Sequence, residues 1–238
     1  MRGIPAVDGA VLVHGGTCAA DIWDELMPLL TFPAVAVDLP GRGSHPADLS
    51  RVTLDDCVAA VFAAADAAGF QRFALIGHSL GGVTITEAAY RQPERVRSVI
   101  YLGALVPTPE VSAARLVTGA DMPPGVLPRM PEAHSRALFG NDLDEAQWAG
   151  VAARLVDDTA AILNATVSGL PLACHRVYIG LAQDIPVPPA LVEAMVGVLG
   201  PDLERITLDT GHMIMNSQPQ LLATTLAGLV RAFWPSRV

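Results

Sequence analysis

The chain has 238 residues, 51% of them hydrophobic, and carries a formal net charge of −9. This length favours one globular domain with room for an inserted subdomain, and no apolar run approaches the length of a membrane span. The negative charge argues against nucleic acid and anionic membranes as partners. Because Pro5 and Asp8 interrupt the first apolar segment, we expect no signal peptide and a cytoplasmic location.

The composition also bears on cofactors and origin. Cys18, Cys57 and Cys174 are an odd number without a C-x-x-C pair, so we expect neither a disulfide framework nor a zinc site. The sequence has no motif for another metal or a nucleotide, and the expected cofactor is none. All basic residues are arginine, which together with abundant Ala, Gly and Pro indicates a bacterial, GC-rich genome.

Short apolar segments alternate along the chain with longer helical patterns. Val/Ile/Leu-rich segments that end in turn residues predict strands at 10–15, 34–41, 73–79, 98–105, 176–184 and 205–212. Helices are expected at 21–30, 54–69, 80–92, 188–199 and 218–233. This alternation predicts an α/β fold with a mostly parallel sheet of about six strands and helices on both faces. Ligands of such sheets bind at the carboxyl ends of the strands.

One region interrupts the alternation. Residues 106–172 begin with proline-rich stretches and continue with helical patterns, and they are too long for an ordinary connection. We expect them to form a mostly helical cap over the sheet. The core would then comprise residues 1–105 and 173–238.

The stretch Gly77-His78-Ser79-Leu80-Gly81 matches G-x-S-x-G between a predicted strand and a predicted helix. This context is the one in which a nucleophilic serine sits on a sharp turn, with small neighbours that give the backbone clearance. The alternative is a helix N-cap serine in a glycine-rich connection. Position along the chain favours the nucleophile.

A serine nucleophile needs a base and an acid that orients it. His212 follows the last predicted strand and comes after Ser79 in chain order, as this arrangement requires. Asp184 ends the preceding strand and is the predicted acid, against the alternative of a turn residue. Asp209 is a rival acid, although it lies only three residues before His212.

Two backbone N–H groups are candidates for stabilising an oxyanion. Leu80 follows the serine, and Gly16 lies in the "HGGT" stretch directly after the first predicted strand. Such donors are worth about 3–4 kcal/mol each in the transition state. The alternative for this stretch is a simple flexible turn.

These segments resemble the α/β-hydrolase superfamily, in the branch of plant methylesterases, hydroxynitrile lyases and bacterial pyrethroid-type esterases. The resemblance spans nearly the whole chain and includes "VLVHGG", "DLPGRG", "GHSLGG", "YLGALVP" and "GHMIMNSQP". It implies that Ser79, Asp184 and His212 are the nucleophile, acid and base. It implies also that Gly16 and Leu80 are the oxyanion donors.

The same resemblance separates two reactions and offers substrate contacts. The lyases of this branch have a threonine and a lysine where this chain has Gly15 and Met213, so both positions resemble the esterase form. Gly15 and Met213 are candidate substrate-binding residues. Leu138, Phe139 and Trp148 of the cap are further candidates, with packing inside the cap as the equal alternative.

The sequence thus predicts a serine hydrolase that cleaves a small apolar carboxylic ester through an acyl-enzyme. One alternative is a lyase or a cofactor-free acid–base enzyme on the same fold, and another is a hydrolase-like protein that senses a ligand. The expected partner is a small-molecule ester, without nucleic acid or membrane. The oligomeric state stays open, with a homodimer as one option.

Overall fold

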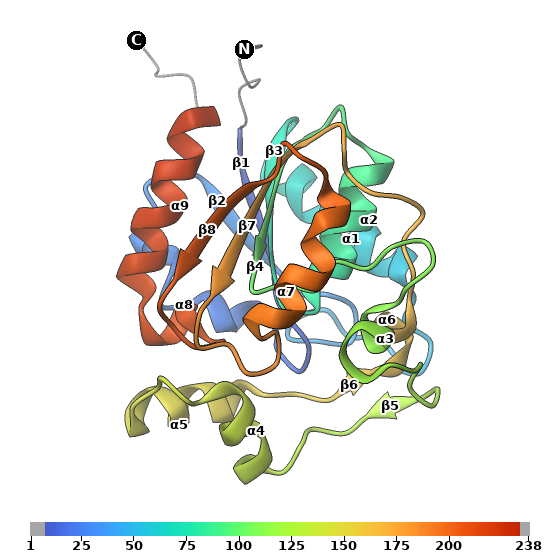
Figure 1. Cartoon of the computed structure of the whole chain (residues 1–238), viewed down its shortest axis with the longest axis vertical. Coiled ribbons are helices and arrows are strands. Elements are labelled where there is room, and N and C mark those ends of the chain that lie inside the picture. Colours follow the sequence, from blue (N-terminus) through green and yellow to red (C-terminus); the bar gives the residue numbers. More distant parts are fainter. Residues whose placement is uncertain (1–7, 234–238) are drawn as a thin grey trace.

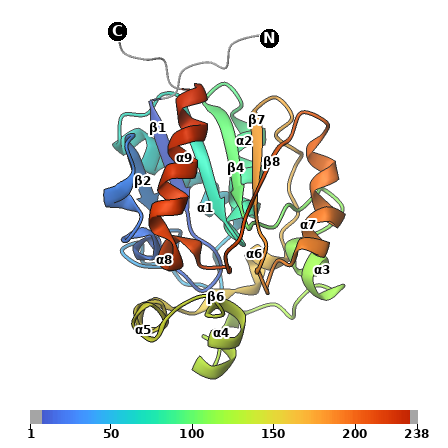
Figure 2. The same ribbon diagram turned by 60° about the vertical axis from the view of Figure 1, so that its left-hand side comes forward.

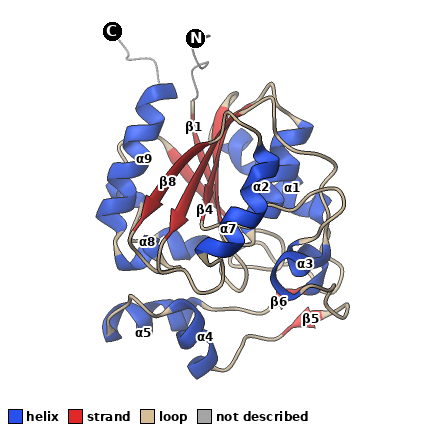
Figure 3. Cartoon of the chain, in the orientation of Figure 1, coloured by secondary structure: helices blue, strands red, loops and turns tan. Residues whose placement is uncertain are grey.

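The fold is built around a sheet of six parallel strands in the computed structural model, which describes residues 8–233 (Figures 1 and 3). The strands lie in the order β2-β1-β3-β4-β7-β8, and neighbours pair in parallel. They are β1 (Gly9–Val13), β2 (Ala34–Val37), β3 (Phe73–His78), β4 (Val96–Leu102), β7 (His175–Leu181) and β8 (Glu204–Leu208). The expected fold class is confirmed.

Helices connect these strands, and most lie where the sequence predicts them. The α-helices are α1 (Leu54–Ala67), α2 (Gly81–Arg91), α3 (Ala113–Thr118), α4 (Glu132–Phe139), α5 (Glu145–Arg154), α6 (Ala160–Asn164), α7 (Pro189–Met195), α8 (Ile214–Ser217) and α9 (Pro219–Phe233). The 3-10 helices are η1 (Ala20–Trp23), η2 (Met27–Leu29) and η3 (Val196–Leu199). None of the helices within residues 8–233 is both long and apolar enough to span a bilayer.

The single helix expected over residues 21–30 is wrong. Two short 3-10 helices, η1 and η2, occupy this stretch instead. Pro28 lies inside η2, where its ring and missing N–H oppose a continuous α-helix through the segment. The apolar pattern of this stretch still marks buried side chains, since Ile22 and Trp23 are buried.

Side chains that alternate along each strand build one apolar layer on each face of the sheet. In β1, Val11 and Val13 join the layer that α1, α2 and α7 cover, whereas Ala10 and Leu12 join the layer under η1 and α9. Figures 1 and 2 show α1 and α2 on one face and α9 on the other. The central strands β1, β3, β4 and β7 are therefore buried on both sides, which explains their nearly continuous apolar runs, whereas the edge strand β8 is largely exposed.

The strand order places a ligand-binding position between β1 and β3. From β1 the chain moves outward to β2, then crosses to the other side of β1 to form β3. Such a reversal leaves a crevice beyond the carboxyl ends of the two strands. The "HGG" stretch, residues 14–16, follows β1, and Ser79 follows β3. Two predicted site segments therefore meet here.

The inserted segment 106–172 has two parts with different surroundings. Helices α4 and α5 lie beyond the carboxyl ends of the strands (Figures 1 and 2). Helices α3 and α6 instead contribute Ala113 and Ile162 to an apolar layer of the sheet. Strands β5 (Val126–Leu127) and β6 (Asp158–Thr159) form a small antiparallel sheet that the sequence did not predict. The boundaries of a cap subdomain stay a prediction.

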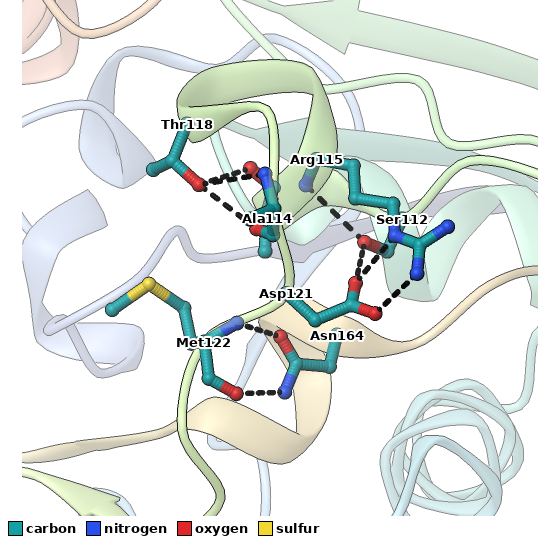
Figure 4. A network of polar contacts seen from close by, with 8 residues as sticks. Ser112, Ala114, Arg115, Thr118, Asp121, Met122 and Asn164 are labelled. Atoms are coloured by element: carbon teal, nitrogen blue, oxygen red, sulfur yellow. Dashed lines mark hydrogen bonds and ion pairs between the residues drawn. The ribbon is translucent and has the colours of Figure 1, made fainter.

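Polar contacts fix the start of this insertion (Figure 4). Ser112 caps α3 by accepting from the Arg115 N–H at 3.2 Å, and its hydroxyl donates to Asp121 at 2.9 Å. The Arg115 guanidinium also binds Asp121. The Asn164 amide pairs with both backbone groups of Met122, each at 2.8 Å. The proline-rich stretch is thus fastened at its beginning to α3 and α6.

Candidate active site

Ser79 occupies a strained turn at the end of β3. Its φ of 52° is uncommon for a residue with a side chain, and such strain gathers at functional sites. The Ser79 N–H donates to the Leu102 carbonyl at 3.2 Å. Its own carbonyl accepts from the N–H groups of Gly82 at 3.1 Å and Leu105 at 3.0 Å. These three bonds hold the backbone in a conformation that serine would otherwise avoid.

The alternative of a helix-capping serine is wrong. Helix α2 begins at Gly81 with Leu80 at its N-cap, and no side chain caps it. Ser79 lies one residue earlier, in a left-handed conformation rather than the extended one of a capping residue. A methyl group on Gly81 would lie 2.6 Å from the His14 carbonyl oxygen, so the turn needs glycine for close approach of two backbones.

The loop after β1 lies directly against this turn. A methyl group on Gly15 would be 2.8 Å from the Cβ of Ser79, and one on Gly16 would be 3.4 Å from a methyl carbon of Leu80. Within residues 8–233, the N–H groups of Gly16 and Leu80 have no acceptor in the protein. The two residues predicted to carry the oxyanion donors therefore lie side by side.

His212 and Asp184 are in direct contact. The His212 Nδ1–H donates to Asp184 Oδ2 at 2.8 Å, and both residues are buried. The other oxygen of Asp184 accepts from the Val187 N–H at 2.7 Å. Gly103, with φ of 49°, passes so close that a methyl group there would lie 2.9 Å from Asp184 Oδ2. The imidazole is thus held with Nε2 available as a proton acceptor.

The rival acid has a different environment. Asp209 is exposed and accepts a hydrogen bond from the Gln183 side chain at 2.9 Å. It follows the last residue of β8, and the chain turns before it reaches His212. Of the two candidate acids, Asp184 is the one that contacts the imidazole.

His78, the residue before the serine, supports the loop that carries His212. Its Nε2–H donates to the His212 carbonyl at 2.9 Å, and the two rings lie 4.5 Å apart between centroids. Burial lowers the pKa of His78 well below its ordinary value, and the neighbouring His212 lowers it further. A neutral His78 therefore joins the serine turn to the loop that carries His212.

His14 plays a similar structural part in the loop after β1. Its Nε2 accepts from the Leu39 N–H at 3.2 Å, and its Nδ1–H donates to the Gly15 carbonyl at 2.8 Å. Burial lowers its pKa to about 4, so the ring is neutral near pH 7. Burial likewise raises the pKa of the Cys18 thiol to about 12, which makes this cysteine a poor nucleophile.

The other cysteines and the acidic groups form no metal site here. All three cysteines are free and buried. Among residues 8–233, His, Cys, Asp and Glu side chains make no cluster of three or more that could hold a metal ion.

The candidate substrate-binding residues lie in different environments. Phe139 is half-buried and stacks on His212, with centroids 5.6 Å apart. Leu138 is half-buried beside it on α4. Trp148 is buried and its Nε1–H donates to Glu132 at 3.3 Å, while Met213 is buried in the α9 layer. Of these four, Phe139 is the one with a ring contact to His212.

The turn after α4 contacts the strand ends that carry the acid and the base. The Asn141 side chain donates to the Gln183 carbonyl at 2.8 Å. Asp142 accepts from the Gly211 N–H at 2.7 Å. Since these partners directly precede Asp184 and His212, one turn of the inserted segment fixes the spacing of the two loops. The sequence alone does not reveal this contact, because an Asn-Asp pair after a helix is typical of any turn.

A second contact of the inserted segment lies at the loop after β1. Asp158 of β6 accepts from the N–H groups of Thr17 and Thr159, both at 2.7 Å, and forms an ion pair with Arg42. Asp158 and Arg42 are 2% and 4% exposed. The adjacent Asp157 is exposed, and nothing in the local sequence distinguishes the two aspartates. Sequence analysis therefore missed this pair as well.

Comparison with known proteins agrees with this architecture. Residues 10–225 match the alpha/beta hydrolase family, and the chain belongs to it. The chain is similar to a pyrrolizixenacetamide deacetylase of Xenorhabdus hominickii, with 25% identity over 89% of this chain and 86% of that protein. A pyrethroid hydrolase of Sphingobium wenxiniae is 24% identical over 95% of this chain and 89% of that protein.

Among solved structures, polyneuridine aldehyde esterase has the same fold. Its TM-score is 0.77 at 22% identity, and the match covers 93% of this chain and 98% of that one. The expected family is confirmed by the family match, and the relatives include a polyneuridine aldehyde esterase and a pyrethroid hydrolase, as the expected branch does. The relatives' names are those of esterases and hydrolases, which confirms the expectation of an enzyme of the esterase type.

Proposed function

We propose that this protein hydrolyses small, apolar carboxylic esters with Ser79 as nucleophile, His212 as base and Asp184 as the acid that orients the base. The hydrogen bond between Asp184 and His212, at the same edge of the sheet as the strained serine that follows β3, is the observation that carries the proposal. It supplies the oriented proton acceptor without which a serine hydroxyl is a weak nucleophile.

The first half of the reaction acylates the enzyme. Ser79 Oγ attacks the ester carbonyl carbon while His212 Nε2 takes the hydroxyl proton, and the carbonyl oxygen becomes an oxyanion. The free N–H groups of Gly16 and Leu80 stabilise this oxygen, with about 3–4 kcal/mol each as the usual magnitude. The C–O bond then breaks, and the alcohol leaves with the proton from His212.

The second half releases the acid. His212 takes a proton from water, the resulting hydroxide attacks the acyl carbonyl, and the tetrahedral intermediate collapses with return of the proton to Ser79. Throughout, Asp184 keeps the Nδ1–H of His212 in place and stabilises the imidazolium that forms twice per cycle. Apart from the ester and water, all of the groups that take part in these steps come from this chain.

The substrate class is proposed from the surroundings of the triad. Phe139 stacks on His212, and Leu138 lies half-buried on the same helix, so α4 brings an apolar ring against the base. A related protein is named a deacetylase of an acetamide, which favours including acetyl compounds among the substrates. A panel of esters that varies acyl and alcohol size separately, with an acetanilide added, would define the specificity.

The lyase alternative meets a steric obstacle at Gly15. Any side chain there would place Cβ 2.8 Å from the Cβ of Ser79. The threonine that the hydroxynitrile lyases have at this position would therefore fit only if the loop after β1 shifted. Assaying mandelonitrile cleavage beside ester hydrolysis separates the two activities, and cleavage faster than hydrolysis would contradict the proposal.

The decisive experiment compares Ser79→Ala with Ser50→Ala, a matched control at an exposed loop serine. Ser79→Ala should abolish p-nitrophenyl acetate turnover, by about 10³-fold or more, and should prevent labelling by a fluorophosphonate probe. Ser50→Ala should retain both. Strong labelling of Ser79→Ala at another site, or an ester substrate panel that yields thermal shifts without product, would overturn the esterase assignment.

A further inference from the structure

The buried Arg42–Asp158 ion pair lies at the loop that carries one proposed oxyanion donor. Asp158 comes from β6 of the inserted segment, and Arg42 comes from the loop after β2. Both are almost fully buried, where a charge without a partner is strongly unfavourable. The ion pair between them is therefore not an incidental surface contact.

Asp158 holds the backbone of Thr17, the residue after Gly16. Its Oδ2 accepts the Thr17 N–H at 2.7 Å, while the Thr17 carbonyl accepts from the Val156 N–H at 2.9 Å. Thr17 has a φ of 56°, which is strained for a β-branched residue. Hydrogen bonds to both the N–H and the carbonyl of Thr17 keep this strained backbone in place next to Gly16.

The same carboxylate poses an electrostatic problem. A methyl group on Gly16 would lie 2.9 Å from Asp158 Oδ2, so a negative charge sits beside the residue whose N–H is proposed to bind the ester oxyanion. Uncompensated, it would oppose that oxyanion in a site of low dielectric constant. The Arg42 guanidinium, bound to Asp158 Oδ1, supplies the compensating charge.

We propose that Arg42 and Asp158 are positioning residues of the oxyanion site: Asp158 holds Thr17 so that the Gly16 N–H faces the substrate, and Arg42 neutralises Asp158 so that its charge does not oppose the oxyanion. This inference rests on the esterase function proposed above. It makes the inserted segment part of the catalytic apparatus. His14, which also faces Arg42, is neutral and does not change the charge balance.

The inference predicts that a second substitution restores the kcat lost in the first. Arg42→Met leaves the carboxylate uncompensated and should lower kcat by about 100-fold, with KM changed by less than about threefold, because the effect is on the transition state. Asp158→Asn added to Arg42→Met removes the charge and keeps an oxygen that can accept the Thr17 N–H. The double variant should regain at least about tenfold in kcat over Arg42→Met.

A second readout follows the transition state directly. A boronic acid that forms a tetrahedral adduct with Ser79 should lose affinity in Arg42→Met and regain it in the double variant, in parallel with kcat. The fraction of active sites is measured by the stoichiometry of fluorophosphonate labelling, so that misfolded protein does not lower the apparent kcat. A purely structural pair would leave kcat per labelled site and boronate affinity near wild type.

The outcomes are distinct. A Ser79→Ala variant that still hydrolyses esters overturns the proposed function. If Ser79→Ala is inactive and the double variant is no better than Arg42→Met, only the present inference fails. Should Arg42→Met not fold, Arg42→Lys and Arg42→Gln replace it: the charged variant should exceed the neutral one in kcat by about fivefold or more, and equal values overturn the inference.

Discussion

The candidate site has two sides, one with Ser79 and one with His212, and the inserted segment contacts both. The buried charges are balanced differently on the two sides. On the Ser79 side, the Asp158 carboxylate is buried and paired with Arg42. On the His212 side, Asp184 binds the imidazole, and Asp142 binds the backbone before it. Within residues 8–233, no arginine pairs with either of these two carboxylates.

This difference matches the charges that the proposed reaction creates. A negative oxygen develops beside Ser79, and a positive imidazolium develops at His212. Carboxylates without a cation favour the second charge and would oppose the first. A fold can thus use the same residue type on both sides of one site, provided that it neutralises only the one near the oxyanion.

Asp184→Asn is the substitution on the His212 side with the largest expected effect on kcat. An asparagine can hold the imidazole by its oxygen but cannot stabilise the imidazolium, so kcat should fall by about 10³–10⁴-fold. Asp209→Asn is the matched control, because this exposed carboxylate contacts Gln183 instead and should leave kcat within about twofold. Steady-state ester hydrolysis measures both. A larger loss in Asp209→Asn would reassign the acid.

Sequence reasoning reached the residues that sit at strand ends and missed those that join different segments. Ser79, Asp184 and His212 each follow a strand of the sheet, and parallel strands bring their carboxyl ends to one edge. Asp158 and Arg42 are distant in sequence and belong to no periodic pattern. Their proximity depends on how the insertion returns across the sheet, and no local signal encodes that path.

The same limit applies to elements within the fold. The helix at 54–69 was predictable, because Thr53 and Asp56 form a capping box ahead of an alanine-rich run. The stretch 21–30 has comparable apolar spacing, yet Pro28 and tertiary packing leave it as two 3-10 turns. Periodicity located the buried side chains there but could not fix the hydrogen-bond pattern.

Acid should destabilise the protein through the buried neutral histidines, His14 and His78. Their folded pKa values lie below the ordinary 6.5, to about 4 for His14, so the unfolded chain binds more protons below pH 6.5. Their contribution is present above pH 6.5 and is lost as the pH falls from there toward the lowered folded pKa values, by up to about 1.4 kcal/mol per pH unit for each group.

Urea unfolding between pH 7 and 5 measures this loss. His78→Gln should reduce the slope of unfolding free energy against pH by up to one proton, whereas His134→Gln, at an exposed position, should not. Equal slopes in wild type and His78→Gln would show that His78 is not a buried neutral group in solution.

His78 also joins the two sides, because it precedes Ser79 and donates to the His212 carbonyl. His78→Leu removes that donor, and should cost about 1–3 kcal/mol of stability and about tenfold in kcat. His78→Gln can reach the same carbonyl with its amide N–H and should retain most of the activity. Thermal unfolding and kcat, measured together, check this order. Two variants of equal activity would show that the bond does not position His212.

The smallest expected effect is at Asp142, and it tests the comparison most directly. This side chain is half-exposed and accepts the Gly211 N–H, so Asp142→Ala should lower kcat by about fivefold or less. Asp142→Asn keeps the acceptor and removes the charge, and its kcat should lie between those of Asp142→Ala and wild type. Water can replace part of a half-exposed hydrogen bond, whereas no solvent reaches Asp158 to screen it. If Asp142→Ala were as damaging as Arg42→Met, burial and charge balance would not be what separates the two sides of the site.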